Sequence, residues 1–165
     1  MKKYNATNYV RYKKEVERIQ EELPEVIDSD YTPLSNDQMI KKFLLLVFNL
    51  AHKQSTTQQA SGVMSINDLI QEGNLALTAA VGKVDRTLLL ASDDQEKTLK
   101  SFLSKRIKGA IRRAIDINRG DIRIPEHKLN EIRKNPKDEK MVAMFFNSIF
   151  SSIDEKINDE EDNKA

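Results

Sequence analysis

Apolar residues in the middle of this chain recur at helical spacing through three long segments, and no useful length of sequence alternates with period two. Residues 39–51 are apolar almost all round, which predicts the most buried helix. Residues 66–84 and 95–118 each divide into an apolar face and a polar face. The sequence therefore predicts an all-α fold, a compact helical bundle around one core.

Start and stop signals place the boundaries of these helices. Ser35 with Gln38, Ser65 with Asp68 and Ser92 with Gln95 have the spacing of capping boxes, in which the two residues satisfy each other's backbone donors. These pairs predict helices that begin near residues 36, 66 and 95, and Gly120 is a natural stop for the last of them.

Shorter elements flank this part. A helix over 11–23 is stopped by Pro24, and linkers follow at 25–34 and 54–62. We expect the three leucines of 86–91 to pack on the core from a loop. Pro125 opens a short helix to residue 134, and an amphipathic helix over 141–157 precedes an acidic end that we expect to be disordered. The domain organisation is thus an N-terminal helix and linker (1–34), a helical domain (35–134), and a C-terminal helix with its tail (135–165).

Composition excludes several classes of function. The chain of 165 residues has no cysteine, so disulfide and thiol chemistry are excluded. No apolar run is long enough to cross a membrane, and the polar N-terminus lacks a signal-peptide core, so we expect a cytoplasmic protein. His52 and His127 lie far apart without metal-spaced partners, and the five glycines form no phosphate loop. We expect no enzymatic activity, no metal and no cofactor.

Charge is distributed unevenly, although the net charge is only +1. Residues 97–134 hold twelve Lys or Arg and four Asp or Glu, a net of +8, whereas residues 138–165 hold eight acidic and three basic residues, a net of −5. Such asymmetry suits two different partners, or shielding of the basic part by the acidic one. A solvated surface with accidental clustering is the alternative.

The polar face of residues 66–84 is a stripe of amides and acids without a lysine until Lys83. A face that serves solubility alone would ordinarily mix lysine into it, so the stripe favours a protein-binding surface, with ordinary solvated surface as the alternative. We call it the docking stripe, and its residues are Asn67, Asp68, Gln71, Glu72, Asn74 and Thr78.

The polar face of residues 95–118 is basic, with one aromatic side chain projecting onto it. A basic face follows phosphates, and an aromatic ring within it can stack on an unpaired base. Alternatively, the ring packs under a neighbouring loop and the charge serves solubility. This basic face consists of Phe102, Lys105, Arg106, Lys108, Gly109, Arg112 and Arg113.

Gly109 removes a side chain from the middle of the basic face, which costs about 1 kcal/mol of helix stability relative to alanine. Three explanations are open: close approach of a neighbouring helix, close approach of a nucleotide backbone, or drift.

At these residues the chain resembles region 2 of the bacterial sigma factors, the transcription initiation subunits. Asp68-Leu-Ile-Gln-Glu-Gly-Asn-Leu75 is similar to the polymerase-binding helix of that family, and residues 43–53 are similar to the helix before it. Lys108-Gly-Ala-Ile-Arg-Arg-Ala-Ile115 and Ile122-Arg-Ile-Pro-Glu-His127 are similar to the promoter-reading helix and the start of region 3. The resemblance covers residues 35–134.

The resemblance implies partners for both surfaces. The docking stripe would bind the coiled coil of the largest subunit of core RNA polymerase. The basic face, with Arg123 and His127, would bind the promoter −10 element and hold its non-template strand as the duplex opens. Phe102 falls where the family has an aromatic residue that captures a flipped base.

The chain also departs from the family pattern. Lys105 and Arg106 stand where primary sigma factors have the paired tryptophans that wedge the duplex, and Gly109 replaces a glutamine that reads a base. Nothing after residue 134 resembles region 4, which binds the −35 element. A reduced sigma factor of this kind resembles the late-transcription factors of tailed phages, which use other proteins as activators, and this implies a bacterial host cytoplasm.

The C-terminal amphipathic helix could supply a second contact, with the polymerase flap, a sliding clamp or a coactivator, or it could be a further core helix. Its contact residues would be Phe145, Phe146, Ile149 and Phe150. Two other functions remain open for the whole chain. One is an adaptor or inhibitor that occupies the sigma site on polymerase without opening promoters; the other is a repressor that acts without polymerase.

Overall fold

The computed structural model describes residues 6–23, 31–56, 64–119 and 123–149, and these form helices without any strand. The helices are α1 (Ala6–Glu21), α2 (Asn36–Ser55), α3 (Ile66–Val81), α4 (Arg86–Leu90), α5 (Gln95–Asn118), α6 (Glu126–Lys134) and α7 (Glu139–Ile149). The predicted all-α fold is confirmed. The described residues up to Ile115 form one compact unit, and those from Asp116 onward form a second.

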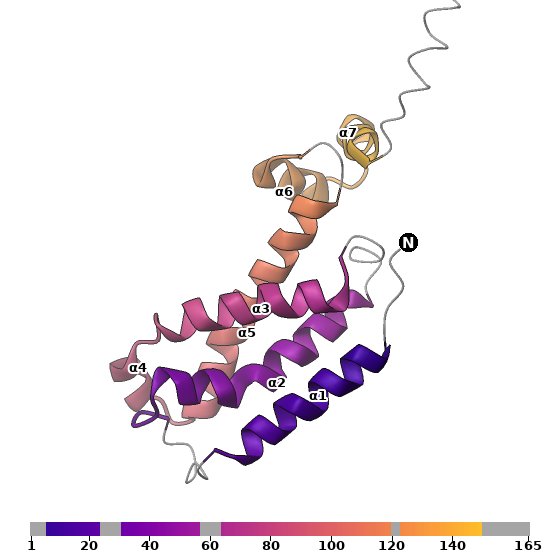
Figure 1. Cartoon of the computed structure of the whole chain (residues 1–165). Helices are drawn as coiled ribbons and strands as arrows, with labels where there is room; N and C mark the ends of the chain where they lie inside the picture. Colours follow the sequence, from indigo (N-terminus) through magenta and orange to yellow (C-terminus); the bar gives the residue numbers. More distant parts are fainter. Residues whose placement is uncertain (1–5, 24–30, 57–63, 120–122, 150–165) are drawn as a thin grey trace, which may run out of the picture. The chain divides into compact units, whose positions relative to one another are not determined.

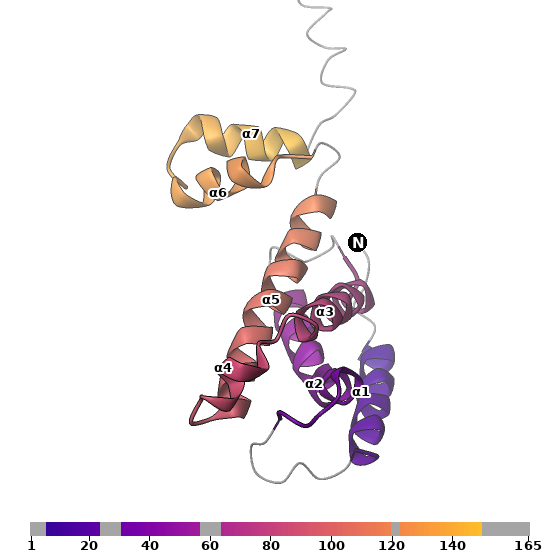
Figure 2. The same cartoon turned by 90° about the vertical axis from the view of Figure 1, so that its left-hand side faces the viewer.

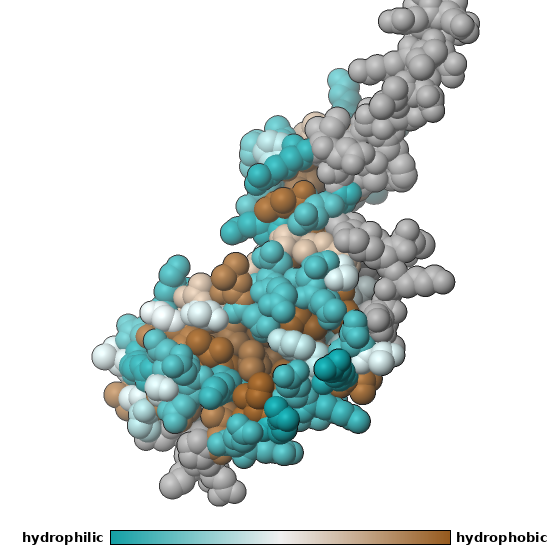
Figure 3. All heavy atoms as spheres, in the orientation of Figure 1, coloured by the Kyte–Doolittle hydropathy of each residue, from teal (hydrophilic) through white to brown (hydrophobic). Residues whose placement is uncertain are grey.

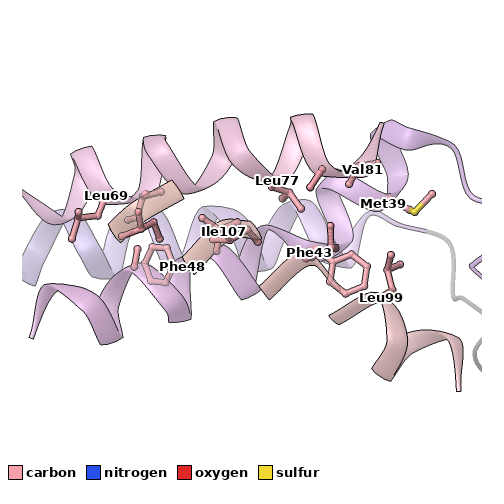
Figure 4. Close-up of a cluster of buried hydrophobic side chains, with 14 of the residues drawn as sticks. Met39, Phe43, Phe48, Leu69, Leu77, Val81, Leu99 and Ile107 are labelled. Atoms are coloured by element: carbon pink, nitrogen blue, oxygen red, sulfur yellow. The ribbon is translucent and has the colours of Figure 1, made fainter. Parts of the chain in front are cut away.

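In the first unit, α2 and α3 run side by side in opposite directions (Figure 1). Figure 2 shows α1 and α5 on opposite sides of this pair. The core lies between α2, α3 and α5, where Phe48, Leu77 and Ile107 are fully buried (Figure 4). On the face in Figure 3, polar residues dominate, and hydrophobic ones gather over the middle of α2 and α3. The apolar stretch 39–51 supplies five fully or nearly fully buried residues to this core: Met39, Phe43, Val47, Phe48 and Ala51.

At Gly73, side chains of α2 and α5 pack directly against the backbone of α3. A Cβ atom on this residue would lie 2.5 Å from Cγ1 of Val47 on α2, and 3.4 and 3.6 Å from the side chains of Ile111 and Ile107 on α5. Val47 is fully buried and its β-branched side chain is stiff, so it cannot move aside cheaply. Glycine is therefore required at this position by packing.

Two of the three predicted capping boxes are confirmed. The Ser35 hydroxyl accepts from the backbone N–H of Gln38 at 3.2 Å, and the Gln38 side chain accepts from the N–H of Ser35 at 2.9 Å. Ser65 and Asp68 form the same reciprocal pair at 3.2 and 2.9 Å. These bonds fix the first turns of α2 and α3.

The third box, Ser92 with Gln95, is wrong. Asp94 caps α5 instead, because its carboxylate accepts from the backbone N–H of Lys97 at 2.8 Å and its charge is favourable at a helix N-terminus. The Ser92 hydroxyl donates to the carbonyl of Leu89 at 2.7 Å. The Gln95 side chain is used elsewhere, since its oxygen accepts from the N–H of Tyr31 at 2.8 Å.

The segment before α2 is held against the start of α5 by polar contacts. Besides the bond from Tyr31 to Gln95, the Arg86 guanidinium donates to the carbonyls of Thr32 and Leu34 at 2.6 and 2.8 Å and to the Asn36 side chain at 3.0 Å. The Tyr31 ring is 2% exposed and packs beside Phe43. Residues 31–36 are thereby anchored to residues that follow α3 in the sequence.

Other boundaries differ from expectation. α1 begins at Ala6, five residues before the predicted start, and α3 ends at Val81 rather than near 84. The leucines expected to pack from a loop form the helix α4, in which Leu89 is buried while Leu88 and Leu90 are 69% and 60% exposed. A single helical turn can direct only one of three successive side chains inward.

The second unit is built from the end of α5 together with α6 and α7. Pro125 directly precedes α6, so its predicted role as the helix opening is confirmed. Asp116 accepts from the guanidinium of Arg133 at 2.6 Å, and Leu129 is buried. Ile117 near the end of α5 is 41% exposed. α7 begins at Glu139 rather than at 141, and the predicted helical stretch 150–157 and acidic end lie outside the described residues.

The compact units divide the chain differently from the three expected segments. α1 belongs to the same unit as α2 and α3, and the division falls at 115/116, inside the segment 35–134. α1 belongs to this unit because its aromatic rings pack on α2. The centroid of the Tyr9 ring lies 4.4 Å from that of Phe48, and the Tyr12 ring stacks on the Phe48 ring with centroids 5.8 Å apart.

We predict opposite effects of the same substitution at two glycines. Gly73→Ala forces the new methyl group against Val47 and should lower the free energy of unfolding by about 1–3 kcal/mol. Gly109→Ala is the matched control: nothing lies within 4 Å of its Cβ position, so the variant should gain about 1 kcal/mol from helix propensity. Urea unfolding midpoints measure both. Equal or higher stability of Gly73→Ala would contradict the close approach of the helices.

A second prediction concerns Tyr31. Burial raises the pKa of its phenol to about 12, and the nearby Glu96 carboxylate, which accepts a hydrogen bond from it, adds to the effect. The folded state thus holds this proton more tightly than the unfolded chain, so the stabilisation is complete below the ordinary tyrosine pKa of about 10 and is lost as the pH rises toward 12.

An ultraviolet titration of tyrosinate checks this. One of the four tyrosines should ionise after the others, and Tyr31→Phe should remove that last step. Stability should also fall more steeply with alkaline pH in the wild type than in the variant. A late step that survives in Tyr31→Phe would refute the assignment.

Candidate functional site

The docking stripe lies on the outward side of α3. Asn67, Asp68, Gln71 and Thr78 are exposed, and Glu72 and Asn74 are half-buried. The opposite side of the helix is buried through Leu69, Gly73 and Leu77. The predicted division of this helix into two faces is therefore present, and the structure brings the six stripe residues onto one surface.

Asp68 and Thr78 of the stripe also have partners within α3 and its cap. Asp68 is the acid of the capping box, and its carboxylate accepts from the hydroxyl of Ser65 at 2.7 Å as well as from its N–H. Thr78 donates its hydroxyl to the carbonyl of Asn74 at 3.0 Å. Asp68 thus both fixes the start of α3 and adds negative charge to the stripe.

Leu75 is an exposed apolar residue beside this polar surface. It is 69% exposed and follows Asn74 directly on α3. Protein interfaces commonly surround an apolar contact with polar groups that exclude water. The stripe therefore includes an apolar contact that sequence analysis did not single out, although an apolar residue between amide positions could have signalled it.

α1 forms one border of the stripe, which sequence analysis also missed. The amide of Asn74 donates to the hydroxyl of Tyr12 at 3.1 Å, which joins the two helices across the surface. A hollow of about 310 Å³ lies between the helices, lined by Asn8, Arg11, Tyr12 and Glu15 of α1 and by Asn67, Ile70 and Gln71 of α3. No local sequence signal predicts this contact, because it depends on how α1 packs on α2.

The basic face lies on the outward side of α5. Lys105, Arg106, Lys108, Arg112 and Arg113 are exposed, whereas Leu103, Ile107 and Ile111 are fully buried. Lys105, Lys108 and Arg112 form no ion pair with any residue that the structure describes. Their positive charges are therefore available to a phosphate backbone.

Phe102 lies at the border between the core and the basic face. Its ring is half-buried and packs against the core cluster, as expected for a structural residue. The guanidinium carbon of Arg106 lies 3.7 Å from the ring centroid, so a cation covers the ring on the basic face. The aromatic residue is on the predicted face, but its ring is occupied by Arg106.

Gly109 is exposed, and apart from the adjacent backbone of α5, no atom of the described residues lies within 4 Å of a Cβ placed on it. Close approach of a neighbouring helix is therefore not the reason for this glycine, which leaves a nucleotide backbone or drift. The empty volume lies next to Arg106 and Arg113 in the helical row, since residues three and four apart are neighbours on a helix surface.

The remaining predicted residues belong to the second unit. Arg123 and His127 are exposed, just before and at the start of α6. Phe145 on α7 is half-buried, with the Arg119 guanidinium 5.3 Å from its ring centroid. Phe146 and Ile149 lie in α7, but their side chains are outside the described residues, as is all of Phe150.

Neither the metal-binding nor the membrane-spanning class of site is found. In the four described ranges, no three His, Asp or Glu residues form a group that could hold a metal ion. None of the helices described here has the length and apolar character needed to cross a membrane.

Comparison of the sequence with models of known families and with curated proteins finds no match. The family resemblance inferred from the motifs therefore stays a prediction.

Proposed function

We propose that this chain is a sigma factor that binds core RNA polymerase and directs it to promoter −10 elements, where it assists strand opening. In this proposal the chain has no catalytic chemistry of its own, because polymerase carries out the reaction. As a reduced factor of the phage late type, it would act in the cytoplasm of a bacterial host.

One observation carries the proposal: a single core presents an acid-and-amide surface on α3 and a separate cationic surface on α5. The docking stripe borders α1, whereas the basic face belongs to α5, which lies on the other side of the α2–α3 pair (Figure 2). A protein that must hold polymerase and DNA together needs two surfaces that do not compete for space. An acidic and amide surface does not attract DNA, and a cationic surface does.

The stripe supports the polymerase-binding part of the proposal through its chemistry. The carboxylates of Asp68 and Glu72 can pair with basic side chains of a partner helix, and the exposed Leu75 can supply an apolar contact between them. We propose that the hollow beside α1 accepts a partner side chain at the edge of this interface.

The basic face supports the DNA-binding part. Each neutralised phosphate releases counterions, so binding through about four phosphates should weaken about a hundredfold between roughly 50 and 200 mM salt. Lys105, Lys108 and Arg112 are exposed cations suited to this contact. Lys105 and Arg106 stand in place of the tryptophan wedge, and their attraction for phosphates would help to hold the opened strand.

The adaptor or inhibitor is the second candidate function, and one observation favours it. The two wedge positions hold Lys105 and Arg106 instead of aromatic residues. Such a chain could occupy the sigma site on polymerase without opening a promoter. A contact from α7 with a flap, clamp or coactivator would instead support the sigma function.

Run-off transcription separates the two functions. Core polymerase is combined with the chain on a template with an AT-rich −10 promoter, with and without candidate coactivators. We expect transcripts of defined length that depend on the chain. Absence of transcripts, together with competition against the host sigma factor, would establish the inhibitor and refute the sigma function.

Charge reversal tests the docking stripe. Glu72→Lys places a cation among the stripe residues and should weaken binding to core polymerase by about thirtyfold, corresponding to about 2 kcal/mol for a central interface residue. Glu17→Lys makes the same change on α1 outside the stripe and should leave binding within about twofold. Circular dichroism confirms that both variants fold. Unchanged affinity of folded Glu72→Lys would refute the docking assignment.

A further inference from the structure

Four residues of α5 form a row along its outward side. Phe102, Arg106, Gly109 and Arg113 are separated by four, three and four positions, which places them on one face of the helix. An aromatic ring, a planar cation, an empty position and a second planar cation therefore succeed one another within the basic face.

The Arg106 guanidinium is held in place by Phe102. The cation lies 3.7 Å from the centroid of the ring, and the ring is in turn fixed by packing against the core cluster. Guanidinium and ring are both planar groups, so the cation–π contact orients the guanidinium. Arg106 is exposed, and its outer side is therefore presented to solvent.

Gly109 leaves space beside this guanidinium. In the described part of the chain, no side chain and no other helix comes within 4 Å of its Cβ position. Any other side chain one turn after Arg106 would project into the same region. The row thus contains an oriented planar cation next to an open position of the helix surface.

We propose that a nucleobase of an unpaired strand stacks on the outer face of the Arg106 guanidinium. Phe102 lies behind the guanidinium, and Gly109 leaves the space that the base occupies. Arginine planes are common stacking partners of unpaired bases, and the surrounding lysines attract the phosphates on either side. This inference rests on the proposed function. It differs from what the family resemblance implies, because the base contacts Arg106 rather than the ring of Phe102.

The test uses the full chain without polymerase, at low salt, where attraction of phosphates is strongest. Fluorescence anisotropy measures its affinity for a short AT-rich single strand that carries one abasic residue at each position in turn. If one base stacks on the protein, its removal should weaken binding about tenfold at a single position.

Arg106→Lys is the decisive variant. It retains the charge but loses the planar group, so we expect it to bind the intact strand about tenfold more weakly and to become insensitive to the abasic residue. Arg18→Lys is the matched control, because it makes the same change at an exposed helical position on α1, outside the basic face. It should retain nearly full affinity and the abasic effect.

Gly109→Leu examines the open space. No described atom obstructs the position and leucine favours a helix, so the variant should fold at least as stably as the wild type. We expect the Gly109→Leu variant to lose the abasic effect as well, since the leucine side chain would occupy the space that we propose for the base.

Any of these results would overturn the inference: no position-dependent abasic effect in the wild type, an unchanged effect in Arg106→Lys, or an equal loss in Arg18→Lys. An effect that is lost in Phe102→Leu but kept in Arg106→Lys would assign the base to the ring and likewise overturn it. The run-off assay decides the proposed function separately. A chain that shows the abasic effect without directing transcripts keeps the stacking site and loses the sigma function.

Discussion

The approach of α2, α3 and α5 at Gly73 determines how the rest of the first unit is arranged. With no side chain at this position, Val47 and Ile111 pack directly against the backbone of α3. Because α5 is seated there through its apolar face, its cations must point away from the core. The same contact turns the other side of α3 outward, so one packing constraint orients both surfaces on which the proposed function depends.

The two surfaces differ in how much additional structure they carry. The docking stripe is bordered by α1, which joins it through the bond between Tyr12 and Asn74, so the neighbouring helix helps to shape what a partner protein would meet. The basic face is formed by one helix, and its only built feature in the described part of the chain is Arg106 over Phe102 beside an empty Gly109. A shaped hollow suits a protein side chain, whereas an open cationic helix with one oriented plane suits a flexible strand.

Local signals in the sequence were sufficient to place the first turns of α2 and α3. The boxes at Ser35 and Ser65 are formed as predicted because their hydrogen bonds join residues only three apart. The box at Ser92 failed because Asp94 competes for the same backbone donors from a better position. The packing of Leu88 and Leu90 was also mispredicted, since hydrophobicity does not indicate which residues of a single turn face inward.

By itself, the sequence determined the helical class, the starts of α2 and α3 and the division of α3 and α5 into apolar and polar faces, since these follow from spacing within one segment. The tertiary structure decided that α1 borders the docking stripe, that Phe102 is covered by Arg106 and that Gly73, rather than Gly109, is required by packing. Both glycines lie inside helical patterns. The neighbours of Gly73 come from α2 and α5, whereas no other described segment approaches Gly109. Contacts between residues distant in the chain depend on helix crossing, which periodicity does not specify.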